Sequence, residues 1–322
     1  MAKITIQNRR LQVTRDETVL ECLLRNNFNV PFACQKGQCQ SCRVRALKGS
    51  PTPVSQQGLR ETEKAQNFFL SCVCFPVDDM DIVLGDENLP LVTTRVYSIE
   101  EVNESIIRIK MECPPDYDYF AGQSINLYND EGVFRTYCLS SVPGLDEHLE
   151  LEINLVPGGQ VTPWVFKTLT IGSEINISRP SGNCFYLPGD KSQPMIMVAT
   201  GIALAPTRGI VRDALVKHRH TGPIVLYHET YGPNEDYLIR DLNELARQYP
   251  NLSCNDYLSA KEVSEDGMSA NEAVLSTIDN LGAWRIFLCG DFNRVSGMTR
   301  DSLMSGARMN NIHMLPFTLS KS

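Results

Sequence analysis

The sequence predicts a multidomain protein with three small domains: an α+β domain over residues 1–89, an antiparallel six-stranded β-barrel over residues 90–190, and an α/β domain with a parallel sheet over residues 191–322. Three patterns predict this division. Cysteines crowd the first part, short alternating strands with turn residues fill the middle, and strands alternate with helical stretches in the last part. At about 150 residues per domain, a chain of 322 residues would give two domains. The patterns, and not the length, therefore give three.

Composition and charge argue against several classes of protein. The chain is 42% hydrophobic and 21% charged, which is typical of globular domains. Its longest nearly apolar run, residues 194–206, is far shorter than the roughly 20 residues of a membrane-spanning helix, and we expect no export signal. A net charge of -8 argues against nucleic-acid binding. The eleven cysteines are therefore expected in a reducing, cytoplasmic setting, as free thiols or metal ligands.

The cysteine spacing in the first domain predicts an iron–sulfur cluster. Cys34, Cys39 and Cys42 form a C-x4-C-x2-C pattern, and Cys72 follows 30 residues later. Four thiolates at this spacing hold a plant-type [2Fe-2S] cluster, and the stretch PFACQKGQCQSC is expected to be a loop. The alternatives are scattered buried thiols and structural zinc, although zinc sites usually pair two C-x2-4-C knuckles and only one is present. Either Cys72 or Cys74 could be the fourth ligand.

The other elements of this domain are expected to surround that loop. An amphipathic stretch containing Cys22 predicts a helix that buries this cysteine. Short strands are expected at residues 3–7 and 11–14 as a hairpin, and then at 43–46, 69–75 and 81–84. This order resembles the β-grasp fold of plant-type ferredoxins. The resemblance implies Cys72, in the sequence FLSC, as the fourth cluster ligand.

The middle domain contains a sequence of flavin-binding type. Strands are expected at residues 91–99, 106–111, 124–128, 133–139 and 149–155, as in a small antiparallel barrel. The stretch RTYCLSS, from Arg135 to Ser141, resembles the R-x-Y-S-x-x-S flavin signature of the ferredoxin–NAD(P) reductase superfamily. Cys138 stands where that signature has its first serine. Taken alone, the stretch could equally be a barrel strand with alternating exposed side chains.

Two more sequences of this domain resemble the same superfamily. PGGQVT, at residues 157–162, resembles its glycine turn at the start of a helix, and RPSGNCF, at residues 179–185, resembles its G-P-x-G-x-F loop with arginine in place of the first glycine. An arginine can hold a pyrophosphate by paired hydrogen bonds, and a helix N-terminus also favours the anion. The resemblance implies FAD, bound by Arg135, Thr136, Tyr137, Cys138, Ser141, Gly159, Gln160, Val161 and Thr162.

The last domain alternates strands with helices, which predicts a parallel sheet covered on both faces. Ligands of such sheets bind at the carboxyl ends of the strands. The expected strands are residues 195–199, 224–228, 252–257, 285–289 and 312–317. The expected helices are residues 206–220, 235–248, 270–278 and 294–307.

Two strand ends of this domain resemble the superfamily's nicotinamide site. The turn ATGIALAP resembles its G-T-G-x-A-P motif, with Gly201 and Pro206 among the direct matches. The sequence FLCGD resembles its C-G-x-P strand end, which implies that Cys289 and Gly290 lie beside the nicotinamide. Phe317 stands in the place of the terminal aromatic that covers the flavin, although it could instead be a core phenylalanine of an edge strand.

Charge after the second strand of this domain predicts which nicotinamide cofactor is used. An arginine accommodates the 2′-phosphate of NADPH, whereas an acidic group that bonds a free 2′-hydroxyl favours NADH. The sequence YHETYGPNEDYL contains Glu229, Glu235 and Asp236 and has no arginine before Arg240. NADH is therefore expected, with Glu229 as a binding residue.

Across nearly its whole length the chain resembles the reductase components of bacterial multicomponent oxygenases. The resemblance implies that NADH gives a hydride to FAD, that Cys138, Cys289 and Phe317 line the reacting groups, and that single electrons pass through the [2Fe-2S] cluster to a separate Rieske-type or diiron oxygenase. Reductases of this build also serve a deoxysugar dehydratase or a quinone. The other hypotheses are an electron carrier or redox sensor with weak NADH use, and a structural protein with buried thiols.

Overall fold

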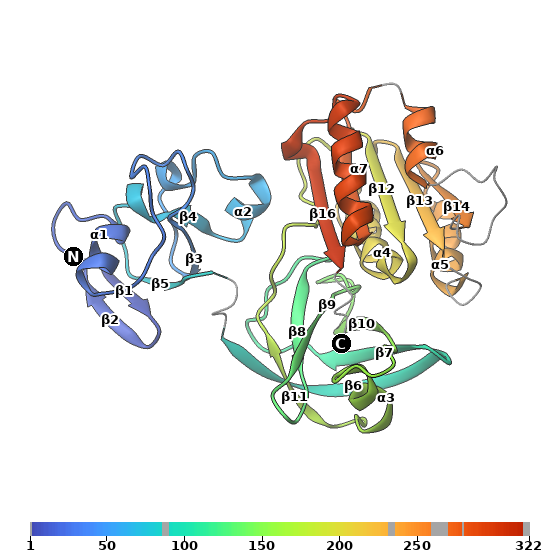
Figure 1. Cartoon of the computed structure of the whole chain (residues 1–322), viewed down its shortest axis with the longest axis horizontal. Helices are drawn as coiled ribbons and strands as arrows, with labels where there is room; N and C mark the ends of the chain where they lie inside the picture. The colour runs from blue at the N-terminus through green and yellow to red at the C-terminus, as the bar shows by residue number, and fades with distance from the viewer. Residues whose placement is uncertain (1, 86–89, 231–235, 259–269, 279, 318–322) are drawn as a thin grey trace. The chain divides into compact units, whose positions relative to one another are not determined.

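The structure is a computed structural model that describes residues 2–85, 90–230, 236–258, 270–278 and 280–317. The chain divides into two compact units, residues 1–90 and 91–322 (Figure 1). The first unit is an α+β domain. The second contains an antiparallel six-stranded sheet followed by a parallel five-stranded sheet. The predicted fold class is therefore confirmed.

The first unit is a mixed sheet with one capped helix. Its strands are β1 (Lys3–Ile6), β2 (Arg9–Gln12), β3 (Arg43–Lys48), β4 (Phe68–Leu70) and β5 (Met80–Val83), in the order β2-β1-β5-β3-β4. Helix α1 (Val19–Arg25) begins at a capping box of Thr18 and Glu21 and buries Cys22, as predicted. Helix α2 (Glu61–Ala65) precedes β4. The strand predicted over residues 69–75 is wrong beyond Leu70, because the chain turns there into a short 3-10 helix, η2 (Ser71–Val73).

The antiparallel sheet of the second unit curls toward closure. Its order is β10-β7-β6-β11-β8-β9, and past the end of β9 the N–H of Ser140 donates to the carbonyl oxygen of Glu150 at 3.0 Å. Strand β11 was absent from the expected set, although Ile175 and Ile177 alternate with polar residues there. The elements are β6 (Leu91–Asn103), β7 (Ile106–Glu112), β8 (Ser124–Tyr128), β9 (Phe134–Cys138), β10 (His148–Asn154), α3 (Thr162–Lys167) and β11 (Glu174–Ser178).

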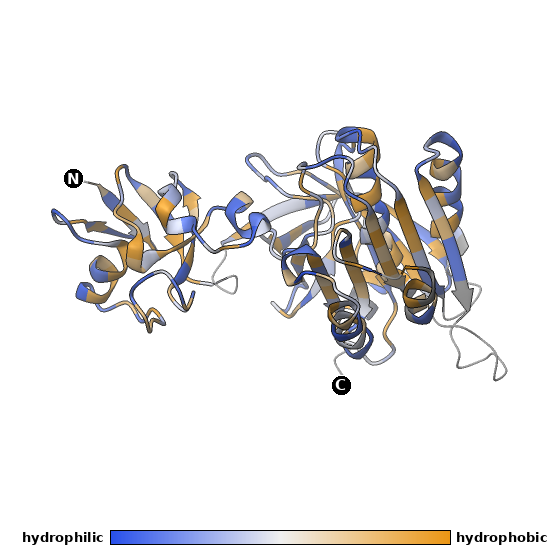
Figure 2. Ribbon diagram, turned by 90° about the horizontal axis from the view of Figure 1, so that it is seen from above, coloured by the Kyte–Doolittle hydropathy of each residue, from blue (hydrophilic) through white to orange (hydrophobic). Residues whose placement is uncertain are grey.

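The parallel sheet has the order β14-β13-β12-β15-β16, with helices on both faces. The central strand β12 (Met195–Thr200) is buried along its whole length. The strands of this sheet are largely hydrophobic in Figure 2. Met195 and Met197 pack on one side with α4 and α5, whereas Ile196 and Val198 pack on the other with α6 and α7. The other elements are α4 (Leu204–Arg212), β13 (Ile224–Thr230), α5 (Asp236–Gln248), β14 (Leu252–Leu258), α6 (Ala270–Thr277), β15 (Arg285–Asp291), α7 (Phe292–Met304) and β16 (Ile312–Phe317).

The helix predicted over residues 206–220 starts earlier and changes its pitch. A 3-10 turn over Gly201–Ala203 leads directly into α4, and a π-helical segment over Asp213–Lys217 follows it. The nicotinamide-type turn is therefore continuous with α4, so a shift of this helix would move the turn. Within the described residues, no helix has the length and apolar character needed to cross a membrane.

Candidate redox sites

The cysteine loop of the first unit directs backbone amides at thiol sulfurs. The N–H groups of Lys36, Gln38 and Cys39 lie 3.4, 3.3 and 3.3 Å from the Sγ of Cys34. Gly37 sits at a φ of +72°, and a Cβ there would lie 3.3 Å from a methyl carbon of Val73, so the loop folds tightly onto η2. Amides placed this way stabilise thiolates, which are the ligands of iron–sulfur clusters.

The structure brings all four predicted cluster cysteines to this loop. The N–H and hydroxyl of Ser71 donate to the carbonyl oxygen of Cys42 at 3.1 and 2.8 Å, which places Cys72 beside Cys42. Burial, followed by the hydrogen bond with the Cys42 thiol, raises the pKa of Cys72 to about 11. Cys74 is fully buried in the core beside α1, where its carbonyl oxygen accepts from Val19 at 2.9 Å.

The pKa of Cys39, the exposed thiol of the loop, is shifted in the opposite direction. A hydrogen bond from the Ser41 hydroxyl, with further bonds from backbone amides, lowers the pKa of Cys39 to about 6. The donor set therefore suits a [2Fe-2S] cluster, in which four thiolates are shared by two irons. In the described part of the chain, no three or more His, Cys, Asp or Glu side chains are arranged around a single metal ion.

Strand β9 carries the flavin-type residues. Arg135 is half-buried, donates to the neighbouring Phe134 carbonyl at 2.8 Å and makes no ion pair among the described residues. Thr136 donates its hydroxyl to Asn126 at 2.7 Å. The buried hydroxyl of Tyr137 has no hydrogen-bond partner within the residues described, and burial raises its pKa to about 12. An orphaned buried hydroxyl and an uncompensated arginine fit a polar, anionic cofactor such as FAD.

The glycine turn lies in this domain and leads into α3. Val161 and Thr162 are buried, Gly159 is half-buried and Gln160 is exposed. Thr162 Oγ accepts from the N–H of Val156 at 3.0 Å. Because α3 has only six residues, its dipole adds little, and Arg135 is the stronger anion-binding group.

Ser141 has partners within the protein. Its hydroxyl is fully buried, accepts from the Tyr119 hydroxyl at 3.0 Å and accepts from the Glu150 N–H at 3.0 Å. Its hydroxyl thereby holds the end of β9 against β10.

The nicotinamide-type strand ends of β12 and β15 are neighbours. Ala199 pairs with Cys289 in the sheet, and a Cβ at Gly290 would lie 1.9 Å from the Thr200 hydroxyl oxygen. Only glycine therefore permits this approach, at a φ of +148°. Gly201 has a φ of +56°, and Pro206 is buried in the first turn of α4.

Three cysteines meet beneath these strand ends. The sulfur of Cys289 lies 3.8 Å from that of Cys184, and both side chains are buried. A hydrogen bond from the Cys184 thiol lowers the pKa of Cys289. Cys138 lies against the same buried cluster, 3.3 Å from the Ser124 hydroxyl, and burial raises its pKa to about 12. Cys184 lies 105 positions from its partner, so no local pattern in the sequence predicts this pair.

Phe317 and Glu229, the remaining predicted residues, differ in burial and in their contacts. Phe317, at the end of β16, is half-buried against the same hydrophobic cluster as Cys138 and Cys289. Glu229, at the end of β13, is fully buried and paired with Arg294 of α7 at 2.8 Å. Glu235 and the side chain of Asp236 lie outside the described residues.

Three family models match the chain in succession. Residues 3–77 match the 2Fe-2S iron-sulfur cluster binding domain. Residues 93–186 match the oxidoreductase FAD-binding domain, and residues 197–300 match the oxidoreductase NAD-binding domain. The chain is therefore an oxidoreductase in which an iron–sulfur cluster binding domain is followed by FAD-binding and NAD-binding domains. This reductase uses a [2Fe-2S] cluster, FAD and NADH, as its sequence predicted.

Known proteins share this build over most of their length. The reductase component of the naphthalene 1,2-dioxygenase/salicylate 5-hydroxylase systems of Ralstonia sp. is 27% identical over 291 residues, which are 88% of each chain. A Yersinia pseudotuberculosis CDP-6-deoxy-L-threo-D-glycero-4-hexulose-3-dehydrase reductase is 25% identical over 94% of each. The crystal structure of the Amycolatopsis cytochrome P450 reductase GcoB is similar over 100% of both chains, with a TM-score of 0.66 and 26% identity.

Proposed function

We propose that this reductase transfers electrons from NADH, through FAD and its [2Fe-2S] cluster, to a separate oxygenase of the Rieske or diiron type. The observation that carries the proposal is the meeting of Cys138, from the flavin-type strand, with Cys289, from the nicotinamide-type strand end, in one buried cluster. Two cofactors that exchange a hydride need such adjacent sites. Names of relatives such as the naphthalene dioxygenase reductase support an oxygenase as the acceptor.

The residues of the chain would take distinct parts in this function. We propose Cys34, Cys39, Cys42 and Cys72 as the cluster ligands. Bound FAD would accept a hydride and give up its electrons singly. Arg135 would hold the pyrophosphate of FAD, and the Tyr137 hydroxyl would make a hydrogen bond to FAD from the buried side. The neutral Cys138 thiol would donate a hydrogen bond toward the reacting face of the flavin. The other proposed cofactor-site residues are Thr136, Ser141, Gly159, Gln160, Val161, Thr162, Gly201, Pro206, Glu229, Cys289, Gly290 and Phe317.

Glu229 supports NADH in a way that the sequence did not suggest. Its buried carboxylate neutralises Arg294 at the strand end where the adenosine ribose of a nicotinamide cofactor would lie. An arginine that is already paired offers little free charge to the 2′-phosphate of NADPH. We therefore propose that the Glu229–Arg294 pair favours NADH.

The proposal also includes the domain limits and the setting of the protein. We propose a ferredoxin domain over residues 1–89, an FAD domain over residues 90–190 and an NAD domain over residues 191–322. The protein would act in the cytoplasm, without a membrane span and without nucleic acid as a partner.

A second candidate acceptor is a deoxysugar dehydratase. The Yersinia relative named for such a system is similar over 94% of this chain, a larger share than the 88% covered by the Ralstonia relative. The chemistry within the reductase would be the same, and only the protein that docks at the cluster domain would differ.

Partner assays test the proposed acceptor. Purified reductase, loaded with FAD and cluster, is mixed with NADH and, in turn, with a Rieske oxygenase, a diiron hydroxylase and a deoxysugar dehydratase. We expect NADH consumption coupled to product with an oxygenase. Coupling to the dehydratase alone would move the assignment to the second candidate, and NADH oxidation with cytochrome c but with none of the three would contradict both.

A further inference from the structure

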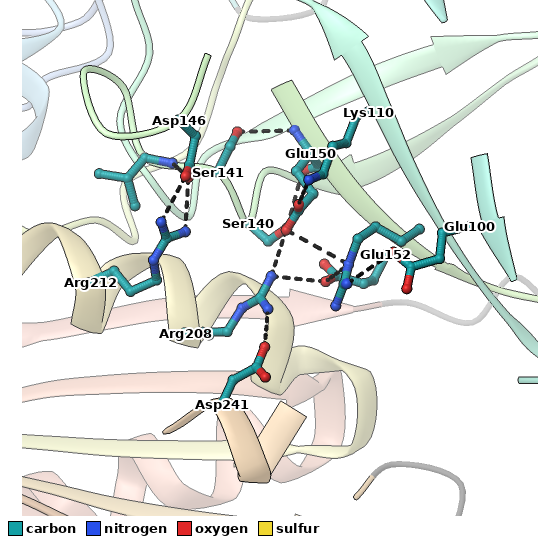
Figure 3. Close-up of polar contacts among 12 residues, drawn as sticks. Glu100, Lys110, Ser140, Ser141, Asp146, Glu150, Glu152, Arg208, Arg212 and Asp241 are labelled. Carbon is teal, nitrogen blue, oxygen red and sulfur yellow. Dashed lines mark hydrogen bonds and ion pairs between the residues drawn. The ribbon is translucent and has the colours of Figure 1, made fainter. Parts of the chain in front are cut away.

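An ion-pair network joins helix α4 of the parallel-sheet domain to strand β10 of the antiparallel sheet (Figure 3). The side chain of Arg208, on α4, is 9% exposed. Its guanidinium lies 2.5 Å from Glu150, 3.1 Å from Glu152 and 2.6 Å from Asp241. Glu150 and Glu152 belong to β10, whereas Asp241 belongs to α5. One arginine therefore holds elements of both sheet domains together.

The Glu150 end of the network is attached to the flavin-type strand. Ser140, two residues beyond Cys138, donates its hydroxyl to the Glu150 carboxylate at 3.1 Å. Its N–H donates to the Glu150 carbonyl oxygen at 3.0 Å, and the Glu150 N–H donates to Ser141 Oγ at 3.0 Å. The position of Glu150 therefore fixes the chain just beyond Cys138.

The Arg208 end is attached to the nicotinamide-type turn. Arg208 lies two residues after Pro206 in the same helix. Thr207, between them, donates its hydroxyl to the Ala203 carbonyl oxygen at 2.8 Å and also makes a hydrogen bond with the Cys289 thiol. A movement of α4 would therefore move the turn and a neighbour of Cys289 together.

Close backbone packing supports the same coupling independently of charge. A Cβ at Gly209 would lie 2.6 Å from the Ser140 carbonyl oxygen, and a Cβ at Gly122 would lie 2.7 Å from the Ile210 side chain. In addition to this packing, Arg212, four residues after Arg208 in α4, bonds Asp146 of the antiparallel domain through two contacts of 2.7 and 2.8 Å. Contacts this close allow little sliding between the helix and the strand end.

A hollow of about 390 Å³ beside the network could suggest a ligand site, but its charges cancel. An anion would need surplus positive charge, and a cation surplus negative charge. Four basic and four acidic side chains line it: Arg108, Lys110, Arg208 and Arg212, and Asp146, Glu150, Asp241 and Glu244. The network therefore connects the two sheet domains and does not form a site for a charged ligand.

We propose that Arg208 is a positioning residue that sets the flavin-type strand and the nicotinamide-type turn at the spacing that hydride transfer needs. The proposal rests on the proposed function. Without Arg208, the neighbouring Glu150 and Glu152 would face each other with Arg108 as their remaining close arginine, 3.9 and 3.1 Å away. Because transfer is steeply sensitive to placement, the rate at saturating NADH would fall more than the affinity for NADH.

Stopped-flow flavin reduction by NADH tests this in the FAD- and cluster-loaded protein. For Arg208→Met we expect a rate constant at saturating NADH lower by about tenfold or more, an apparent Kd for NADH within about threefold, and unchanged cytochrome c reduction after chemical reduction of the flavin. Arg208→Lys should recover part of the rate. The matched control is Arg95→Met, whose exposed pair with Glu174 at 3.0 Å lies within the antiparallel sheet.

Hydrogen exchange of the variants without added cofactor gives a second readout. The backbone amides of residues 139–152 and 204–212 should exchange faster in Arg208→Met than in the wild type. In Arg95→Met they should exchange at the wild-type rate. If Arg208→Met does not fold, Glu150→Gln and Arg208→Lys are measured instead. Each should lower the rate at saturating NADH more than it changes the apparent Kd for NADH. An unchanged rate with unchanged exchange in folded variants would overturn the inference. Failure of the wild-type flavin to be reduced by NADH would instead contradict the proposed function.

Discussion

Cys39 of the first unit and Cys138 of the second unit lie in opposite environments. In the first unit, Cys39 is exposed, and hydrogen bonds from Ser41 and from backbone amides lower its pKa to about 6. In the second unit, burial raises the pKa of Cys138 to about 12, and its hydrogen bond with Cys289 together with burial raises that of Cys184. The thiol of Cys39 is thus set up to ionise near neutral pH, whereas the thiol of Cys138 is kept neutral. Hydrogen-bond donors around an exposed sulfur lower the pKa of Cys39, and burial raises the pKa of Cys138.

The largest expected effect tests which thiols of the first unit are ligands. Cys72→Ala should abolish the iron content and visible absorbance of the cluster, because η2 brings Cys72, and not Cys74, to the loop. Cys74→Ala is the matched control. It should keep the cluster and lower the free energy of unfolding by about 1–2 kcal/mol through lost burial. Loss of iron from the Cys74 variant with retention in the Cys72 variant would assign Cys74 as the ligand.

The next effect concerns the ion pair of Glu229 and Arg294 in the second unit. Glu229→Gln leaves Arg294 uncompensated, so the preference for NADH over NADPH, measured as the ratio of kcat/KM values, should fall about tenfold, since an arginine can bond a 2′-phosphate. Glu147→Gln, at an exposed position of the same unit, should leave the ratio unchanged. An equal ratio in wild type and Glu229→Gln would show that the pair has no part in cofactor choice.

A smaller effect is expected from the neutral thiol of β9. A hydroxyl is a stronger hydrogen-bond donor than a thiol, so Cys138→Ser should speed flavin reduction a few-fold or shift the flavin potential. Cys254→Ser, at a half-buried thiol of β14, is the control. Because the pKa of Cys138 is raised from 9.0 to about 12, its thiol should stay protonated from pH 7 to 10 and the wild-type rate should show no thiol titration there. Unchanged rate and potential in Cys138→Ser would remove the role assigned to this residue.

The sequence predicted the fold class because local signals agreed with it. The alternating strands of the middle domain and the αβ alternation after residue 193 reflect burial patterns that each segment carries by itself. Strand β11 was missed even though Ile175 and Ile177 alternate correctly with polar residues. The end of β4 at Leu70 was missed because the same buried, apolar residues serve both a strand and the 3-10 turn that presents Cys72.

The parts of the sites that escaped prediction depend on distant pairs. Arg208 and Glu150 are 58 positions apart, Glu229 and Arg294 are 65 apart, and Cys184 and Cys289 are 105 apart. No local pattern shows that such residues meet, because charge and thiol pairing are decided by how the sheets pack. Cys34, Cys39 and Cys42 could be grouped from the sequence because their spacing along one loop limits their geometry, whereas Cys72 is brought to this loop by η2.

An anaerobic titration with NADH, followed by visible absorbance and low-temperature EPR, tests the central claim most directly. The purified protein, with FAD and iron content measured beforehand, should take up about three electrons per chain, two on the flavin and one on the cluster. The EPR signal of a reduced [2Fe-2S] centre should grow as the flavin bleaches. An uptake of two electrons with no EPR signal would contradict the account.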